Sequence, residues 1–179
     1  MKLASAFILN EVKESLERID QTISEAVCNA IIMAKSIFVY GVGRSGLVGK
    51  AFSVRLVQMG LDVHFIGDTT TPIVEKDDLL IVISNTGETM SAAQTANIVG
   101  RIGATVITLT SNQHSKLGRA SNIIVEIQTT KIEDRRKLAP LGTLFEVASM
   151  VYLDSLVPTL MSKLEQTEAS MRKRHAIWV

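Results

Sequence analysis

Two short segments combine glycine with hydroxyl side chains in the way that phosphate-binding loops do. The segment SNTGET, residues 84–89, holds three hydroxyls and one glycine directly after the apolar run LLIVI. The segment GVGRSG, residues 41–46, fits the pattern GxGxxG directly after SIFVY. Each segment joins a predicted strand to a predicted helix, and the N-terminus of a helix favours an anion through its free N–H groups and its dipole. The sequence therefore predicts two anion-binding loops.

The residue types in these loops suit the terminal oxygens of a phosphate monoester. Serine and threonine hydroxyls donate hydrogen bonds, an arginine adds positive charge, and glycine lets a ligand approach the backbone. The same residues are also ordinary helix caps and turn formers, so either loop alone could be simple capping. Their occurrence on two strands of one predicted sheet favours a phosphate site. The expected substrate-binding residues are Gly43, Arg44, Ser45, Ser84, Asn85, Thr86, Gly87, Glu88 and Thr89.

The glycine pattern also fits a dinucleotide-binding fold, which makes a nicotinamide-dependent oxidoreductase an alternative. That fold expects an acidic residue about 20 positions further on, and Asp68 lies close to that place. A dinucleotide site, however, gives no reason for the hydroxyl-rich segment 84–89. The pattern GxxxxGK[ST] of nucleotide hydrolases does not occur in the sequence.

Two further side chains are candidates for proton transfer. Glu146 stands in the apolar stretch LFEVASMVYLDSLV, where a carboxylate is either a general base or a first-turn charge favoured by the helix dipole. His175 belongs to the basic tail MRKRHA, residues 171–176. An imidazole there can transfer protons near neutral pH, although a surface histidine is the ordinary interpretation. No CxxC pattern or histidine-rich tract indicates a metal site.

Strands and helices must alternate for these residues to meet. Short apolar runs bounded by turn residues predict about five strands, and the helical periods between them predict a parallel sheet covered on both faces. We therefore expect a three-layer α/β/α sandwich. The expected strands are residues 36–40, 61–67, 77–84, 104–111 and 121–128, and the expected helices are 4–35 (one long or two joined), 46–60, 89–103 and 140–164, with a helical tail to about 174. The charged segment 131–137 is expected to be a solvated loop.

Composition limits the remaining possibilities. The 179 residues are 46% hydrophobic and 21% charged, which fits one folded domain over residues 1–179. A net charge of +1 argues against a dedicated nucleic-acid binder. We expect no membrane span, because no uninterrupted apolar run approaches about 18 residues. A single cysteine, Cys28, cannot form an internal disulfide, so a cytoplasmic location is expected.

The pairing of GVGRSG with SNTGET resembles the sugar isomerase (SIS) domain, a family of phosphosugar-binding α/β folds. The segment PLGTLFE, residues 140–146, and the tail MRKRHA narrow the resemblance to the 6-phospho-3-hexuloisomerases within that family. One departure is Asn85 with Thr86, where many members have glycine and serine. Both residues keep the site short and polar, so we expect altered packing and retained binding.

The resemblance implies a reaction, the isomerisation of D-arabino-hex-3-ulose 6-phosphate to D-fructose 6-phosphate through an enediol, in the ribulose monophosphate pathway of formaldehyde fixation. It implies that Glu146 accepts the proton and that His175 assists. It further implies no metal or cofactor, a homo-oligomer that we expect to be a tetramer, and hexulose-6-phosphate synthase as a pathway partner. A non-catalytic phosphosugar sensor and another SIS sugar-phosphate isomerase remain alternatives.

Overall fold

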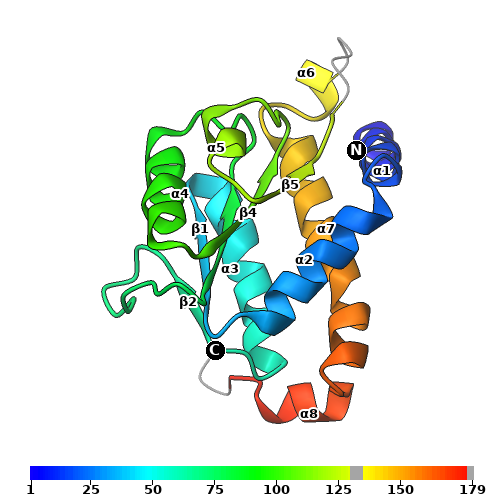
Figure 1. Ribbon diagram of the computed structural model, residues 1–179. Helices are drawn as coiled ribbons and strands as arrows, with labels where there is room; N and C mark the ends of the chain where they lie inside the picture. The colour runs from blue at the N-terminus through cyan, green and yellow to red at the C-terminus, as the bar shows by residue number, and fades with distance from the viewer. Residues whose placement is uncertain (130–134, 177–179) are drawn as a thin grey trace.

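A five-stranded sheet in the order β2-β1-β3-β4-β5 forms the centre of the protein, and all of its strand pairs are parallel (Figure 1). The computed structural model describes residues 1–129 and 135–176. The strands are β1 (Ile37–Gly41), β2 (Val63–Phe65), β3 (Leu79–Ile83), β4 (Thr105–Thr110) and β5 (Ile123–Glu126). The predicted parallel sheet is confirmed. Strand β2 is shorter than predicted.

Strand β3 shows why the apolar runs form a sheet with two covered faces. All five of its residues are buried, and it lies between β1 and β4. A strand that is apolar at every position loses water contact on both faces only when helices cover both sides of the sheet. The continuous run LLIVI therefore belongs at the centre of the sheet.

Helices cover both faces of the sheet, which confirms the predicted three-layer sandwich (Figure 1). One layer packs around Phe52, Phe145 and Ile31, and the other packs against Phe38 and Val82. The first layer holds α1 (Lys2–Glu17), α2 (Gln21–Met33), α3 (Gly43–Gln58), α7 (Thr143–Lys163) and α8 (Glu168–Lys173). The second holds α4 (Met90–Ile102) and the short α5 (Lys116–Arg119), and a short α6 (Arg135–Leu138) precedes α7.

The N-terminal helical region consists of two joined helices. Its helical period allowed either one long helix or two joined helices here. The carboxylate of Asp20 accepts a hydrogen bond of 2.8 Å from the backbone N–H of Thr22 and caps the start of α2. Aspartate at an N-cap satisfies one of the free N–H groups of a new helix. The break between α1 and α2 therefore has a local cause.

Two predicted boundaries are wrong near the candidate loops. Helix α3 begins at Gly43 rather than at residue 46, so Arg44 and Ser45 lie in its first turn. Gly43, the second glycine of this segment, therefore belongs to the helix and not to the loop before it. The segment 131–137 is only partly described: Arg135 to Lys137 belong to α6 and not to a loop, while 131–134 lie outside the described residues.

Helix α7 carries Glu146 in its first turn. It is long and apolar enough to cross a membrane by length and composition, but it packs against α1, α2 and α3. Eight of its residues are buried, among them Phe145 and Leu160. Its apolar character is therefore that of a core helix, and Glu146 stands where this helix begins.

Candidate active site

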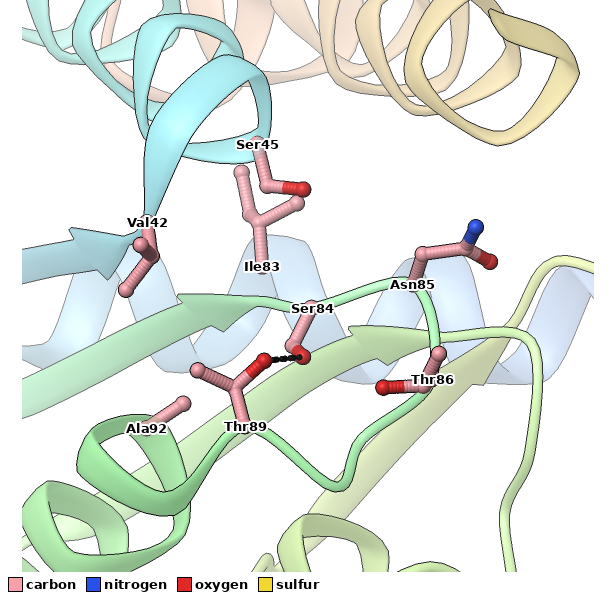
Figure 2. Close-up of a pocket in the computed structure, with 8 residues that line it drawn as sticks. All are labelled: Val42, Ser45, Ile83, Ser84, Asn85, Thr86, Thr89 and Ala92. Carbon is pink, nitrogen blue, oxygen red and sulfur yellow. Dashed lines mark hydrogen bonds between the residues drawn. The ribbon is translucent and has the colours of Figure 1, made fainter. Parts of the chain in front are cut away.

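The two predicted loops meet where the direction of winding changes in the sheet. Strands β1 and β3 are neighbours, yet α3 follows β1 into one helical layer and α4 follows β3 into the other. In open α/β sheets, ligands bind at the carboxyl ends of the strands at such a switch point. A cleft is present there, lined by Val42, Ser45, Ile83, Ser84, Asn85, Thr86, Thr89 and Ala92 (Figure 2).

Three hydroxyls of the segment 84–89 converge in this cleft. Figure 2 shows the hydroxyls of Ser84, Thr86 and Thr89 turned toward the space that the loop encloses, whereas the amide of Asn85 points away from it. Ser84 Oγ lies 3.2 Å from Thr89 Oγ1, and Ser84 is buried. Ser45 reaches the same cleft from the first turn of α3. The geometry therefore unites hydroxyl donors from two strand ends.

The helices that open on the cleft begin without side-chain caps. Within the described part of the chain, neither Val42 before α3 nor Thr89 before α4 makes a capping hydrogen bond through its side chain. By contrast, Asp20, Ser115 and Thr167 cap α2, α5 and α8. The first N–H groups of a helix have no partner within it, so α3 and α4 retain donors and a partial positive charge at the cleft. This arrangement suits an anion.

The size of the cleft matches one end of a small ligand. It encloses about 160 Å³, below the roughly 300–1,000 Å³ of sites that enclose a whole ligand. The glycine pattern has a local cause as well, because a Cβ on Gly46 would lie 2.4 Å from the carbonyl oxygen of Gly41. These glycines therefore allow β1 and α3 to pack closely. The small volume of the cleft favours a phosphate group over a whole dinucleotide.

Gly87 shapes its loop, and its predicted part in substrate binding stays a prediction. Its N–H donates to the carbonyl of Ser84 at 3.2 Å. Its φ is 64°, in the left-handed region, and a Cβ there would lie 2.0 Å from Ser115 Oγ. Glycine is required because the turn is left-handed and packs directly on Ser115. Gly43, with a φ of 58°, plays a similar conformational part at the start of α3.

Glu88 was predicted to bind substrate, but it is tied to the neighbouring loop and does not line the cleft. Its carboxylate accepts the backbone N–H of Lys116 at 3.1 Å and pairs with Lys116 Nζ at 3.2 Å. The hydrogen bond from the backbone N–H of Lys116 lowers the pKa of Glu88, and the hydrogen bond from the Lys116 side chain lowers it further. The carboxylate therefore stays charged to lower pH and holds the two loops together.

The end of β4 supports the same loop, and the sequence reasoning missed this contribution. The carbonyl of Asn85 accepts hydrogen bonds from Thr110 Oγ1 at 3.1 Å and from the N–H and Oγ of Ser111 at 2.8 and 2.7 Å. The sequence does contain a signal for this contribution, which is again a run of hydroxyl residues directly after an apolar strand. Here, however, the hydroxyls brace a neighbouring loop and do not point into the cleft.

Arg44 and Glu146 form an ion pair beside the cleft. Arg44 Nε donates to Glu146 Oε2, joining the first turn of α3 to the first turn of α7. The Arg44 side chain is 70% exposed, and that of Glu146 is 12% exposed. Gly142 lies against the other carboxylate oxygen, since a Cβ there would be 2.7 Å from Glu146 Oε1. Both charged residues were predicted at the site, but their pairing was not.

His175 lies far from this group within the chain. It lines a depression with Arg55, Gln58 and Met171 at the C-terminal end of α3, whereas Ser45 lies at the N-terminal end. These two ends are separated by about 20 Å, given the rise of an α-helix. The Nη1 of Arg174 donates to the carbonyl of Gln58 at 3.2 Å and fixes the tail there. One chain therefore does not bring His175 to Glu146.

No group of three or more metal-ligating side chains gathers within residues 1–129 and 135–176.

Residues 30–154 match the family model of the SIS domain. The chain belongs to the SIS domain family. This SIS domain has the fold and the paired loops that the resemblance implied, and helices α1 and α8 lie outside the matched segment.

Several similar proteins carry the name of one isomerase. The chain is 35% identical to the 3-hexulose-6-phosphate isomerase of Methanocaldococcus jannaschii, over 84% of this chain and 81% of that protein. It is 31% identical to the Bacillus subtilis 3-hexulose-6-phosphate isomerase, over 96% and 95%. A crystal structure from Methanococcus jannaschii, from which a 3-hexulose-6-phosphate isomerase function was inferred, superposes with a TM-score of 0.85 at 31% identity, over 96% and 98%.

Proposed function

We propose that this SIS domain isomerises D-arabino-hex-3-ulose 6-phosphate to D-fructose 6-phosphate through an enediol intermediate. The observation that carries the proposal is the position of a largely buried carboxylate beside the anion cleft. Arg44, which pairs with Glu146, is next in sequence to Ser45, which lines the cleft. A sugar phosphate anchored in the cleft would thus extend toward a general base.

The reaction moves a carbonyl group from C3 to C2. Glu146 takes the proton from C2, and the electrons of the C–H bond form a C2–C3 double bond while the carbonyl electrons move to O3. A proton passes from the C2 hydroxyl to O3, and Glu146 then returns its proton to C3, which leaves the carbonyl at C2. A single carboxylate can serve both carbons, because it accepts a proton from one and donates a proton to the other. Exchange of the carboxyl proton with solvent between the two steps lets deuterium enter at C3.

The phosphate group would be held by Ser45, Ser84, Thr86 and Thr89 together with the uncapped helix ends. These donors supply hydrogen bonds and helix-dipole charge without a lysine. Anchoring the phosphate fixes the position of C2 and C3 relative to Glu146, and such positioning supplies a large share of the rate acceleration of an enzyme.

The similarity to named 3-hexulose-6-phosphate isomerases supports this choice of sugar. We extend the proposal to the ribulose monophosphate pathway, with hexulose-6-phosphate synthase as the enzyme that supplies the substrate, and to a reaction without metal or cofactor. Residues 1–179 would act as one SIS domain, because Val12 of α1 and Met171 of α8 belong to the same core as Phe145. A cytoplasmic location is supported by the buried free thiol of Cys28.

A homo-oligomer, expected to be a tetramer, is the second part of the proposal. Two ion pairs link α3 to α7, Arg44 with Glu146 and Arg55 with Asp154. Leu47 and Val54 lie between Arg44 and Arg55 on α3, and Val151 lies between Glu146 and Asp154 on α7. These three apolar side chains are 64%, 55% and 43% exposed. Association through this surface would remove them from water. A catalytic role for His175 requires such a neighbouring subunit.

The test is proton exchange on fructose 6-phosphate in deuterated water, followed by NMR. We expect deuterium at C3, and release of formaldehyde once hexulose-6-phosphate synthase is added. Binding without exchange would favour the phosphosugar sensor, and exchange without formaldehyde release would favour another SIS isomerase. Calorimetric titration with nicotinamide dinucleotides should show no binding. Tight binding would instead support the alternative function, a nicotinamide-dependent oxidoreductase.

A further inference from the structure

The guanidinium of Arg44 is positioned by Glu146 alone among the described parts of the chain. Its Nε–H donates to Glu146 Oε2, and the side chain is otherwise 70% exposed. A guanidinium carries five N–H donors in a planar fork, so most of them remain available for a second acceptor. That acceptor would necessarily lie close to the carboxylate of Glu146.

The phosphate of a substrate has other donors. The cleft is lined by hydroxyls of Ser45, Ser84, Thr86 and Thr89 and by the first turns of α3 and α4, and Arg44 is not among its lining residues. Donors other than Arg44 therefore line the cleft. The position of Arg44 points to the reacting carbons, where Glu146 acts, and away from the phosphate.

We propose that Arg44 is a catalytic residue that stabilises the enediolate oxygens, an inference that rests on the isomerase function proposed above. Before proton transfer, the guanidinium neutralises the carboxylate of Glu146. When Glu146 takes the proton from C2, the carboxylate becomes neutral and the negative charge passes to O3 of the sugar. Arg44 already stands beside the place where this charge arises, so it can pair with the oxygen that receives it.

The shape of the guanidinium suits both halves of the reaction. In a cis-enediolate, O2 and O3 lie side by side, and two parallel N–H groups of an arginine can donate to both. The charge moves from O3 to O2 as the proton passes between them, and the fork needs no rearrangement. When Glu146 returns its proton to C3, it regains its charge and its pair with Arg44. Charge preorganised in this way is worth most in the transition state.

The substitution Arg44→Gln tests the assignment, because the side chain is exposed and its loss leaves no cavity. Deuterium exchange at C3 of fructose 6-phosphate, measured at saturating substrate, should fall by about 100-fold or more, the loss seen when one oxyanion donor is removed. Arg44→Lys keeps the positive charge but loses the planar pair of N–H donors, so it should recover part of the rate. Affinity for inorganic phosphate, measured by calorimetry, should change by less than about threefold, which is under 1 kcal/mol.

The matched control is Arg101→Gln, which removes an exposed arginine from the last turn of α4. It should exchange at the wild-type rate. Arg44→Gln would refute the assignment if it exchanged at the wild-type rate, or if it lost phosphate affinity about tenfold while keeping its rate at saturation. The latter result would make Arg44 a phosphate ligand. Absence of exchange in the wild-type protein would instead overturn the proposed function, and this inference with it.

Discussion

Arg44 donates a hydrogen bond to Glu146 across 102 residues of sequence and joins the first turns of α3 and α7. Each residue belongs to a different part of the candidate site: Arg44 precedes the cleft residue Ser45, and Glu146 is the proposed base. Their contact connects the elements that carry the candidate cleft and the proposed base, so we expect substitutions in either part to affect turnover.

Substitution Glu146→Gln should abolish isomerisation while sugar-phosphate binding persists. Glutamine keeps the shape of the side chain but cannot accept the C2 proton, so C3 exchange should fall by about 100-fold or more. Calorimetry with fructose 6-phosphate should still show binding. Glu14→Gln, which breaks an exposed pair with Arg18 on α1, serves as the control and should exchange normally. Full activity of the Glu146 variant would remove this residue as the base.

Gly142→Ala should lower kcat with little effect on KM. The backbone of Gly142, with φ −85° and ψ 6°, accepts alanine, so the change acts through the new Cβ, which would lie 2.7 Å from Glu146 Oε1. Displacing the carboxylate by up to 1 Å can reduce turnover by about 100-fold.

Gly100→Ala provides the control for this glycine. Gly100 lies inside α4, and a Cβ added to it would have no atom within 4 Å beyond its own helix and chain neighbours. The substitution should stabilise the protein by about 0.5–1 kcal/mol and leave turnover unchanged. If Gly142→Ala turned over at the wild-type rate, the carboxylate would not need its present position.

Thr89→Val should weaken binding of inorganic phosphate by about tenfold or more, because it removes a hydroxyl donor to a charged ligand. Its side chain does not cap α4, so α4 loses no side-chain cap. Thr167→Val is the same chemical change at a capping threonine. It should lower the free energy of unfolding by about 1 kcal/mol and leave phosphate affinity intact. Equal phosphate affinity in wild type and Thr89→Val would argue against the cradle.

Gly87→Ala should be more damaging than Gly43→Ala, although both glycines have a positive φ. Each substitution carries the backbone cost of about 1–2 kcal/mol. At Gly87 the new Cβ would also overlap Ser115, whereas at Gly43 no atom lies within 4 Å. Overpacking adds about 1–3 kcal/mol. Thermal or urea unfolding measures both, and equal losses would show that the Gly87 loop moves freely away from Ser115.

Val54→Glu should dissociate the proposed oligomer, since a charge on the exposed surface between α3 and α7 opposes its burial. Ile98→Glu is the control: this side chain is similarly exposed, at 59%, but lies on α4 in the opposite layer. Sedimentation should report a smaller species for the first variant and the wild-type species for the second. The reverse result would place the interface on α4.

Much of the fold was predictable because its causes are local. The run LLIVI must be buried on both faces wherever it lies, and the glycine pattern 41–46 permits a tight strand-to-helix turn. Those signals sufficed for the parallel sheet and for both loops. The start of α3 was misplaced because glycines that begin a helix look like glycines that precede one.

The sequence by itself determined the sheet, the layers and the presence of two hydroxyl-rich strand ends. The tertiary structure alone decided which side chains meet: Arg44 turns to Glu146, Glu88 to Lys116, and His175 stays at the far end of α3. Hydrophobic period and turn residues act within a few positions along the chain. Contacts between residues far apart in sequence depend on strand order and on helix packing across the sheet, which no local pattern encodes.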